Sequence, residues 1–188
     1  MSKPRILAFA GSTRKESFNR KLLSIAVELA RQADLDVNQI ELADYPMPIM
    51  NEDLEAEQGQ PANATAVRKM MLEADGLILA CPEYNSSITP LMKNVIDWVS
   101  RKESGGGDLS PYENKKALLL GASPGKRGGK RSVETVRSIL GNIGVEVYDK
   151  EFTLPGAGEA FDQLGRLREV EMVDALKATV KAFAQSIR

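Results

Sequence analysis

The sequence predicts an α/β fold in which helices cover both faces of a five-stranded parallel sheet. Short apolar runs of strand length recur along the 188 residues, and segments with the apolar spacing of an amphipathic helix stand between them. The apolar runs are continuous rather than alternating, which indicates strands buried on both faces. A chain of this length is expected to form one domain, residues 1–188, and to bury about 70% of its unfolded surface.

Five segments have the composition and length of strands. The sequences RILAFA at 5–10 and GLILA at 76–80 are almost wholly apolar, as is KALLLG at 116–121. The remaining two, VNQIEL at 37–42 and VEVYDKEF at 145–152, contain polar residues. Polar or glycine-containing stretches follow these runs, so each predicted strand is expected to end in a loop.

Helical spacing of apolar residues appears between the strands. The predicted helices start near Leu22 and cover about 64–73, 91–99, 133–143 and 164–187. Thr89 and Pro90 fit the cap and the first position of a helix, and Gly144 fits the left-handed residue that ends one. Two longer irregular stretches, 43–61 and 104–114, are expected to shape a site or an interface.

The composition excludes several classes of protein. Basic and acidic residues number 25 and 26, so a nucleic-acid-binding protein or a polybasic membrane protein is not indicated. The single cysteine, Cys81, forbids an intrachain disulfide, and the apolar run at 6–10 is too short for a signal peptide or a membrane span. We therefore expect a cytoplasmic protein. The chain has no histidine, so a Ser or Cys triad lacks its usual base.

The loop after the first strand, GSTRKESFN at 11–19, has the composition of a phosphate site. Ligands bind open parallel sheets beyond the carboxyl ends of the strands, where this loop is expected. It combines Arg14, a forked cation, with a helix N-terminus and with four polar side chains: Ser12, Thr13, Ser17 and Asn19. Three or four charge-assisted hydrogen bonds, each worth about 1.5–3 kcal/mol, can hold a phosphomonoester. The alternative is a polar turn with a solvated arginine.

Two familiar phosphate motifs do not fit the chain. Gly11 is the only glycine between the first strand and the first helix, so the G-x-G-x-x-G pattern of dinucleotide sites is missing there. The stretch from Gly121 to Arg127 is one residue short of a P-loop and ends in arginine.

The loop after the third strand, CPEYNSSITP at 81–90, is expected to present a fixed backbone surface. Exposed N–H groups at 83–87 can read the edge of a flat heterocycle, Tyr84 can stack on it, and Asn85 can donate and accept hydrogen bonds. The alternative is an ordinary loop before a helix with a surface glutamate, Glu83. Cys81 is expected to be a small buried residue rather than a reactive thiol, since no cationic neighbour activates it.

The loop after the fourth strand, ASPGKRGGKRS at 122–132, is rich in glycine and in positive charge. Gly125, Gly128 and Gly129 allow positive φ and a close approach of the backbone to a ligand. An anionic ligand or a phosphorylated second substrate suits its four cations, which are Lys126, Arg127, Lys130 and Arg131. The alternative is a flexible solvated turn.

Three of these segments together resemble the NADPH-dependent FMN reductase family, which includes bacterial quinone, chromate and azo reductases. The segments are GSTRKESFN, PEYNSSITPLMKNVIDWVSR and SPGKRGG, and both G-S-x-R-x-x-S-x-N and P-E-Y-N are complete. The resemblance covers about 5–187. It implies a flavodoxin-like fold with strand order 2-1-3-4-5, FMN as cofactor, NAD(P)H as co-substrate and a small-molecule electron acceptor.

The resemblance also implies a set of flavin-binding residues. The FMN phosphate is expected at Ser12, Arg14, Ser17 and Asn19. The isoalloxazine and ribityl chain are expected at Pro82, Glu83, Tyr84 and Asn85. Ser123, Gly125, Gly128 and Gly129 are expected to close the site or to admit the nicotinamide. No metal site and no catalytic side chain is expected, because flavin N5 carries the hydride chemistry and the protein supplies binding and orientation.

Relatives in this family commonly form dimers or tetramers, so a homodimer or homotetramer is expected. The main alternative in another class is a flavodoxin-type electron carrier or a non-catalytic flavin-binding protein. Such carriers are usually strongly acidic and have no arginine in the phosphate loop, whereas this chain has a net charge of −1 and carries Arg14. A phospho-accepting receiver domain needs an acidic cluster after the first strand, where this chain reads FAGST.

Overall fold

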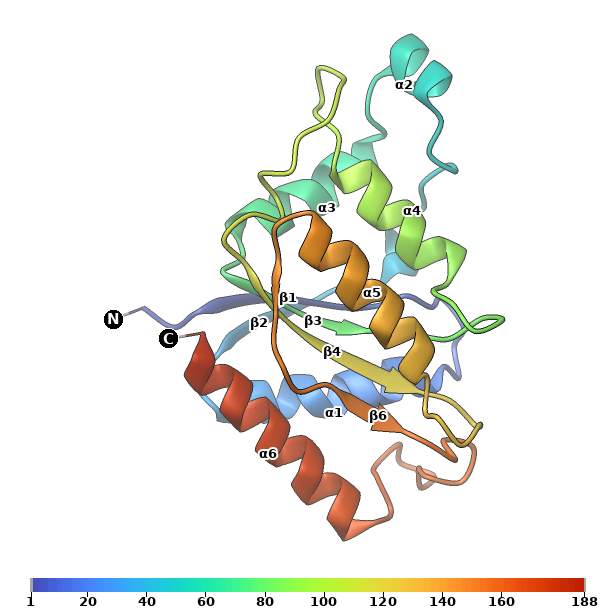
Figure 1. Ribbon diagram of the computed structural model, residues 1–188, viewed down its shortest axis with the longest axis vertical. Coiled ribbons are helices and arrows are strands. Elements are labelled where there is room, and N and C mark those ends of the chain that lie inside the picture. The colour runs from blue at the N-terminus through green and yellow to red at the C-terminus, as the bar shows by residue number, and fades with distance from the viewer. Residues whose placement is uncertain (1, 188) are drawn as a thin grey trace.

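The structure is a computed structural model that describes residues 2–187, and it contains a parallel sheet with helices on both faces (Figure 1). The strand order is β2-β1-β3-β4-β5, and a short β6 also pairs with β4. The pairings between these strands are all parallel, which confirms the predicted fold class and strand order. The bounds are β1 Arg5–Ala10, β2 Asp36–Gln39, β3 Gly76–Ala80, β4 Lys116–Ala122, β5 Glu146–Val147 and β6 Phe152–Leu154.

Alternate residues of the central strands supply two cores. Ile6 and Ala8 of β1 face a cluster that contains Leu22 and Val180, whereas Leu7 and Phe9 face one that contains Val95. This alternation follows from the two-residue period of a strand, and it requires apolar residues at every position of a strand that is covered on both faces. This requirement explains why the strands appear in the sequence as continuous apolar runs.

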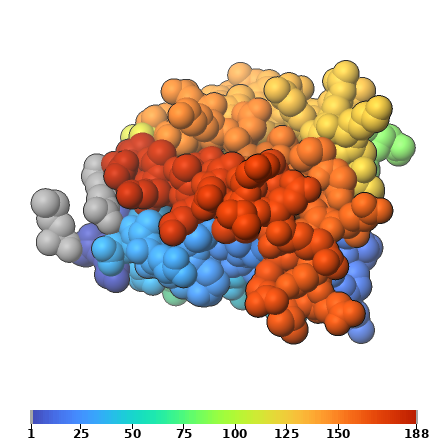
Figure 2. Space-filling view, turned by 90° about the horizontal axis from the view of Figure 1, so that it is seen from below, coloured from blue at the N-terminus to red at the C-terminus, as the bar shows by residue number. Residues whose placement is uncertain are grey.

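The helices form two layers, one on each face of the sheet. The first layer holds α1 Phe18–Gln32 and α6 Val170–Ser186, and the second holds α3 Ala62–Glu73, α4 Pro90–Val99 and α5 Lys130–Asn142. Figure 2 shows α6 lying along α1 on the outside of the first layer. No helix within residues 2–187 is long and apolar enough to cross a membrane.

The predicted helix caps are present. The Thr89 hydroxyl accepts a hydrogen bond from Met92 N at 3.2 Å, and Pro90 occupies the first position of α4. Gly144, with φ of 98°, follows the end of α5. Both features place the loop after β3 and the turn before β5 where the sequence predicts them.

The prediction of one continuous strand at 145–152 is wrong. The chain leaves the sheet after Val147 and returns at Phe152, so β5 and β6 are separate. The polar residues between them cannot be buried on both faces. Arg137 of α5 stabilises the break, because its guanidinium donates to Tyr148 O at 3.0 Å and lies 2.6 Å from the Glu151 carboxylate.

The predicted start of the last helix near Leu164 is also wrong, since α6 begins at Val170. Asp162 organises a turn in place of the first helical turns. Its carboxylate accepts hydrogen bonds from Leu164 N and Arg166 N, both at 2.9 Å, and pairs with the Arg166 guanidinium. Aspartate commonly competes with helical hydrogen bonds in this way.

The irregular stretch at 43–61 contains regular structure that the sequence does not predict. A 3-10 helix covers Leu42–Asp44, and α2 covers Glu52–Gln58. Asn51 caps α2 by accepting from Asp53 N at 2.9 Å, and Gly59 follows its end with φ of 76°. The segment EDLEAEQ has few apolar residues, so the periodicity of a buried face is missing from the sequence.

Candidate functional site

The three loops at 11–19, 81–90 and 122–132 emerge side by side at the carboxyl edge of the sheet. Ala10 pairs with Ala80, and Ala80 pairs with Leu120, so the first two loops begin at the same level and the third begins beside them. Gly11 N donates to Ala80 O at 3.0 Å, and Cys81 N donates to Leu120 O at 2.8 Å. The parallel register therefore brings these loops together, as the sequence predicts.

The first loop presents unpaired backbone donors at the N-terminus of α1. Within residues 2–187, the N–H groups of Ser12, Thr13, Lys15 and Glu16 donate to no protein atom, whereas Arg14 N donates to the Ser12 hydroxyl at 3.3 Å. Ser17 is the N-cap of α1, and its hydroxyl accepts from Arg20 N at 3.4 Å. Free N–H groups and the positive end of a helix dipole are the chemistry of a phosphate site.

Arg20 braces the first loop from within α1. Its guanidinium donates to Arg14 O at 3.2 Å, and its Nε lies 2.8 Å from a Glu41 carboxylate oxygen. The Arg20 Nε hydrogen is not aligned with that oxygen, so the contact is an ion pair rather than a directed hydrogen bond. The brace leaves the Arg14 side chain exposed at the edge of the sheet.

Asn19 connects the first loop to the third. Its Nδ2 donates to Ala122 O at 2.8 Å, and its Oδ1 accepts from Ala122 N at 3.0 Å. The side chain is 4% exposed. Asn19 therefore holds the start of α1 against the end of β4, and one Nδ2 hydrogen remains for a further acceptor.

The second loop is a tight two-residue turn. Tyr84 and Ser87 exchange backbone hydrogen bonds, both at 3.0 Å, around Asn85 and Ser86, whose φ values are 49° and 67°. Two successive positive φ values are the signature of a type I′ turn, in which asparagine is favoured. The turn holds Tyr84 exposed, and it leaves the N–H groups of Asn85 and Glu83 without a protein partner among the described residues.

The Glu83 carboxylate turns toward the third loop. It accepts from Arg131 N at 3.2 Å and lies 3.5 Å from the Arg131 guanidinium, which also donates to the Ser86 hydroxyl at 3.0 Å. The Ser132 hydroxyl donates to Pro82 O at 2.8 Å. Arg131 and Ser132 lie in the first turn of α5, so this helix holds the second loop in place.

Sequence reasoning misses the positioning roles of Thr89 and Ser132. The Thr89 hydroxyl donates to Gly11 O at 2.7 Å in addition to capping α4, and so it joins the second loop to the first. The sequence signals only the cap, because a hydroxyl that donates to a residue of another loop leaves no local pattern. Likewise, the sequence presents Arg131 only as one of four cations, without its partner Glu83.

The glycines of the third loop have different environments. Gly128 is buried with φ of 58°, and a Cβ there would lie 2.7 Å from the backbone of Leu154, so only glycine fits. Gly129 is also buried with positive φ, whereas Gly125 is exposed and its φ is not positive. Gly125 N donates to the Ser123 hydroxyl at 3.1 Å. Gly128 and Gly129 thus pack against β6 and β4, and Ser123 and Gly125 form the outer part of the loop.

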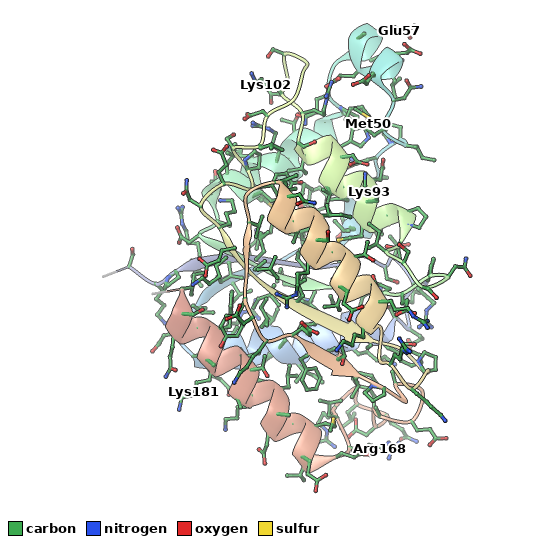
Figure 3. The ribbon with its side chains drawn as sticks, in the orientation of Figure 1. Met50, Glu57, Lys93, Lys102, Arg168 and Lys181 are labelled. Carbon is green, nitrogen blue, oxygen red and sulfur yellow. The ribbon has the colours of Figure 1, made fainter. Side chains whose placement is uncertain are left out.

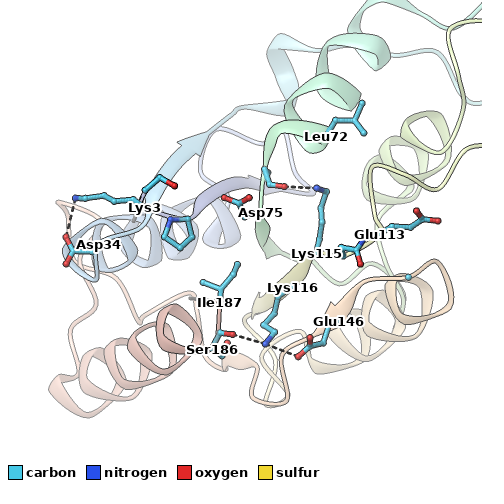
Figure 4. A pocket seen from close by; sticks show the side chains of 15 residues that line it. Lys3, Asp34, Leu72, Asp75, Glu113, Lys115, Lys116, Glu146, Ser186 and Ile187 are labelled. Carbon is cyan, nitrogen blue, oxygen red and sulfur yellow. Dashed lines mark hydrogen bonds and ion pairs between the residues drawn. The ribbon is translucent and has the colours of Figure 1, made fainter.

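One hollow lies beside the third loop, and a larger one lies at the other edge of the sheet. The first, of about 560 Å³, is bordered by Pro124 and Lys126 of the third loop and by Arg168, which Figure 3 shows just before α6. The larger one, about 1530 Å³, lies at the opposite, amino edge of the sheet (Figure 4). Several of its charges are already engaged by the protein, as in the pairs of Lys116 with Glu146 and Lys3 with Asp34, so we place the site at the loops despite the greater volume elsewhere.

Two titratable side chains near the sheet are held in their neutral forms. Burial raises the pKa of the Cys81 thiol, which supports the expectation of a small buried residue. Burial also raises the pKa of Tyr112, whose hydroxyl donates to Ile96 O at 2.8 Å. Neither side chain is a nucleophile at neutral pH.

Comparisons with known proteins find similar sequences over most of the chain. The sequence model of a family described as NADPH-dependent FMN reductase matches residues 4–159. The chain is 33% identical to an NAD(P)H-dependent FMN reductase of Pseudomonas aeruginosa, over 98% of this chain and 95% of that protein. It is 30% identical to a quinone reductase of Escherichia coli, over 99% of this chain and 96% of that protein.

A solved structure is similar over the same extent. The flavoenzyme NAD(P)H:acceptor oxidoreductase FerB from Paracoccus denitrificans superposes with a TM-score of 0.82 at 25% sequence identity. The match covers 98% of this chain and 97% of that one. The similarity therefore extends over almost the whole chain.

Proposed function

Because this chain belongs to the NADPH-dependent FMN reductase family, we propose that its three loops hold FMN and that it passes two electrons from NAD(P)H to a small-molecule acceptor. The observation that carries the proposal is the row of unpaired N–H groups beside Arg14 at the N-terminus of α1. This donor set suits a phosphate dianion, because each N–H lacks a protein acceptor and the helix dipole favours negative charge. Residues 1–188 act as one FMN-binding domain in this proposal.

Bound FMN supplies the redox chemistry, since it accepts a hydride from a nicotinamide and returns two electrons to an acceptor. The protein's own task is to bind and to orient. Arg14 and the first-loop amides take the phosphate, with Ser12 and Ser17 beside them. Asn19 acts mainly by holding α1 against Ala122 and offers its remaining Nδ2 hydrogen.

The second loop serves the flat ring system. The N–H groups of Glu83 and Asn85 are directed donors in a turn that Arg131 holds from α5, so they can stabilise negative charge without reorganising. Pro82 is buried and Tyr84 is exposed. The rigid backbone of this loop would hold the flavin ring, and the exposed Tyr84 would be available to a second flat molecule.

The third loop serves the nicotinamide nucleotide. Ser123 and Gly125 form its outer surface, and the exposed Lys126 borders the hollow of about 560 Å³. Apolar walls from Leu154 and Met172 suit an adenosine, and a cation at the rim suits a phosphate. Gly128 and Gly129 contribute indirectly, because their packing fixes the path of the loop.

We further propose that the protein forms a homodimer or a homotetramer. Helix α2 and the separate glycine-rich loop at 104–107 both project from the rest of the fold (Figure 1), and the ion pair of Glu55 with Arg101 joins α2 to the chain just before that loop. Next to α2, Ile49 is 84% exposed. Long irregular stretches such as 43–61 and 104–114 commonly shape a site or an interface. The cytoplasmic location stays a prediction.

A visible spectrum of the purified protein titrated with FMN, followed by addition of NADPH without oxygen, tests the proposed function. We expect a flavin spectrum perturbed on binding and then bleached by about one equivalent of NADPH. A flavodoxin-type carrier is expected to bind FMN without rapid bleaching by NADPH. A protein that leaves the FMN spectrum unperturbed at every concentration contradicts the proposed site.

Steady-state kinetics test the order of events. If the nicotinamide and the acceptor occupy the same space in turn, double-reciprocal plots of the initial rate against one substrate, at several concentrations of the other, give parallel lines. Intersecting lines contradict the shared space and leave FMN binding itself intact.

A further inference from the structure

Three side chains form a connected stack beside the first loop. The guanidinium carbon of Arg14 lies over the ring of Phe18, 5.2 Å from its centroid. The Phe18 ring is in turn parallel to that of Phe161, with centroids 6.3 Å apart and planes inclined by 2°. Phe18 is the first residue of α1, whereas Phe161 lies between β6 and α6. The stack therefore connects the exposed cation of the first loop to the C-terminal part of the chain.

The far end of the stack is fixed in the core. Phe161 is 9% exposed and belongs to the same apolar cluster as Leu154 and Val180. Its carbonyl accepts from Arg168 Nε at 2.9 Å, and it pairs with Leu167 in an isolated antiparallel bridge. Phe18 is partly buried against this cluster, so its ring has a defined position, and Arg14 rests on that ring.

The guanidinium carbon lies over the face of the Phe18 ring. An arginine that stacks on an aromatic ring keeps its in-plane N–H donors available for a bidentate anion. A free, exposed arginine loses rotamer freedom when it binds a phosphate, and this loss opposes binding. Cation–π attraction to the Phe18 ring reduces that loss, because the side chain is ordered before the anion arrives.

We infer that Phe18 and Phe161 are positioning residues for phosphate recognition: they hold Arg14 at the N-terminus of α1, ready for the phosphate of FMN. The inference rests on the proposed function, since it assumes that Arg14 meets a phosphate. It also predicts a specific pattern. Loss of the stack weakens binding of the phosphorylated flavin and leaves binding of the same ring and ribityl chain without phosphate unchanged.

The experiment measures dissociation constants for FMN and for riboflavin by quenching of flavin fluorescence, in the wild type and in variants. Phe18→Leu and Phe161→Leu each remove one ring and keep apolar volume. Phe152→Leu is the matched control, because Phe152 is a buried phenylalanine of the same cluster that contacts neither Arg14 nor Phe18 in the stack. Phe18→Trp restores an aromatic face and tests for rescue. The fold of each variant is checked by circular dichroism.

We expect Phe18→Leu and Phe161→Leu to weaken FMN binding by about threefold to tenfold at constant riboflavin affinity. Phe152→Leu is expected to leave the ratio of the two constants unchanged, and Phe18→Trp to restore it. Equal losses for both flavins, or no loss, in Phe18→Leu overturn the inference. Phe18 is only partly buried, so this variant decides the result even if Phe161→Leu does not fold. A wild type that binds FMN no better than riboflavin overturns the phosphate site itself.

Discussion

The amide of Asn19 and the backbone of Ala122 exchange two hydrogen bonds, at 2.8 and 3.0 Å, and so join the first and third loops. The two residues are 103 positions apart in the sequence. A primary amide carries a donor and an acceptor side by side, so it can donate to a carbonyl and accept from the N–H of the same residue at once. The contact explains how an asparagine expected to bind phosphate also fixes the geometry of the whole edge.

Asn19→Asp is expected to destabilise the protein at neutral pH. The carboxylate keeps the bond from Ala122 N and loses the donor to Ala122 O, so a buried charge faces a carbonyl, at a cost of about 3 kcal/mol. Urea unfolding followed by circular dichroism measures the change. Asn38→Asp, on the exposed side of β2, is the control and is expected to change the free energy of unfolding little. An unchanged stability of Asn19→Asp contradicts the structural role.

Arg14→Ala is expected to weaken FMN binding and to spare the chemistry. Removal of a charge-assisted contact to phosphate costs about 1.5–3 kcal/mol, which is a loss in affinity of about 10-fold to 150-fold. The rate of flavin reduction by NADPH, measured by stopped flow at saturating FMN, is expected to stay near that of the wild type. Lys15→Ala removes the neighbouring exposed cation and serves as the control. FMN affinity that is unchanged in Arg14→Ala refutes the phosphate assignment.

Lys126→Ala is expected to discriminate between the two nicotinamide nucleotides. If the Lys126 ammonium meets the additional phosphate of NADPH at the rim of the hollow, its removal raises KM for NADPH by about 3-fold to 10-fold and leaves KM for NADH unchanged. Lys181→Ala, on the outside of α6, controls for the loss of one positive charge (Figure 3). Equal changes in the KM values for NADPH and NADH indicate that the additional phosphate of NADPH does not contact Lys126.

The pair of Glu55 and Arg101 is expected to make stability depend on pH. The hydrogen-bonded Arg101 guanidinium holds the pKa of Glu55 below its ordinary value of 4.5. Because the pKa is lower in the folded state, the pair contributes fully above about pH 4.5 and loses its contribution as the pH falls through the folded-state pKa.

Glu55→Gln is therefore expected to lower the free energy of unfolding by about 1.5–3 kcal/mol at neutral pH. The difference from the wild type is expected to shrink as the pH is lowered toward about 3, in urea unfolding at a series of pH values. Glu57→Gln, exposed on the same helix, has no ion-pair partner in residues 2–187 and is expected to show neither effect. A difference that is constant with pH excludes the ion pair as its cause.

The sequence by itself determined the alternation of buried strands and amphipathic helices, and with it the edge of the sheet at which we place the candidate site. The expected strand order came from the resemblance to a known family and not from these local patterns. Continuous apolar runs and helical spacing are local properties, and parallel strands necessarily deliver their following loops to one edge. The loops at 11–19, 81–90 and 122–132 are therefore expected together from local patterns and the rules of parallel sheets. The expectation of a phosphate site in the first loop is equally local, since it depends on residue types within nine positions.

Only the tertiary structure decided which side chains hold those loops in place. The bonds from Asn19 to Ala122, from Arg131 to Glu83 and from Thr89 to Gly11 join residues from different elements, and no periodicity records them. The same holds for α2, whose one buried side chain is a glutamate matched by Arg101. Local propensity specifies each element, but a buried polar group acquires its role only when packing brings its partner within hydrogen-bonding distance.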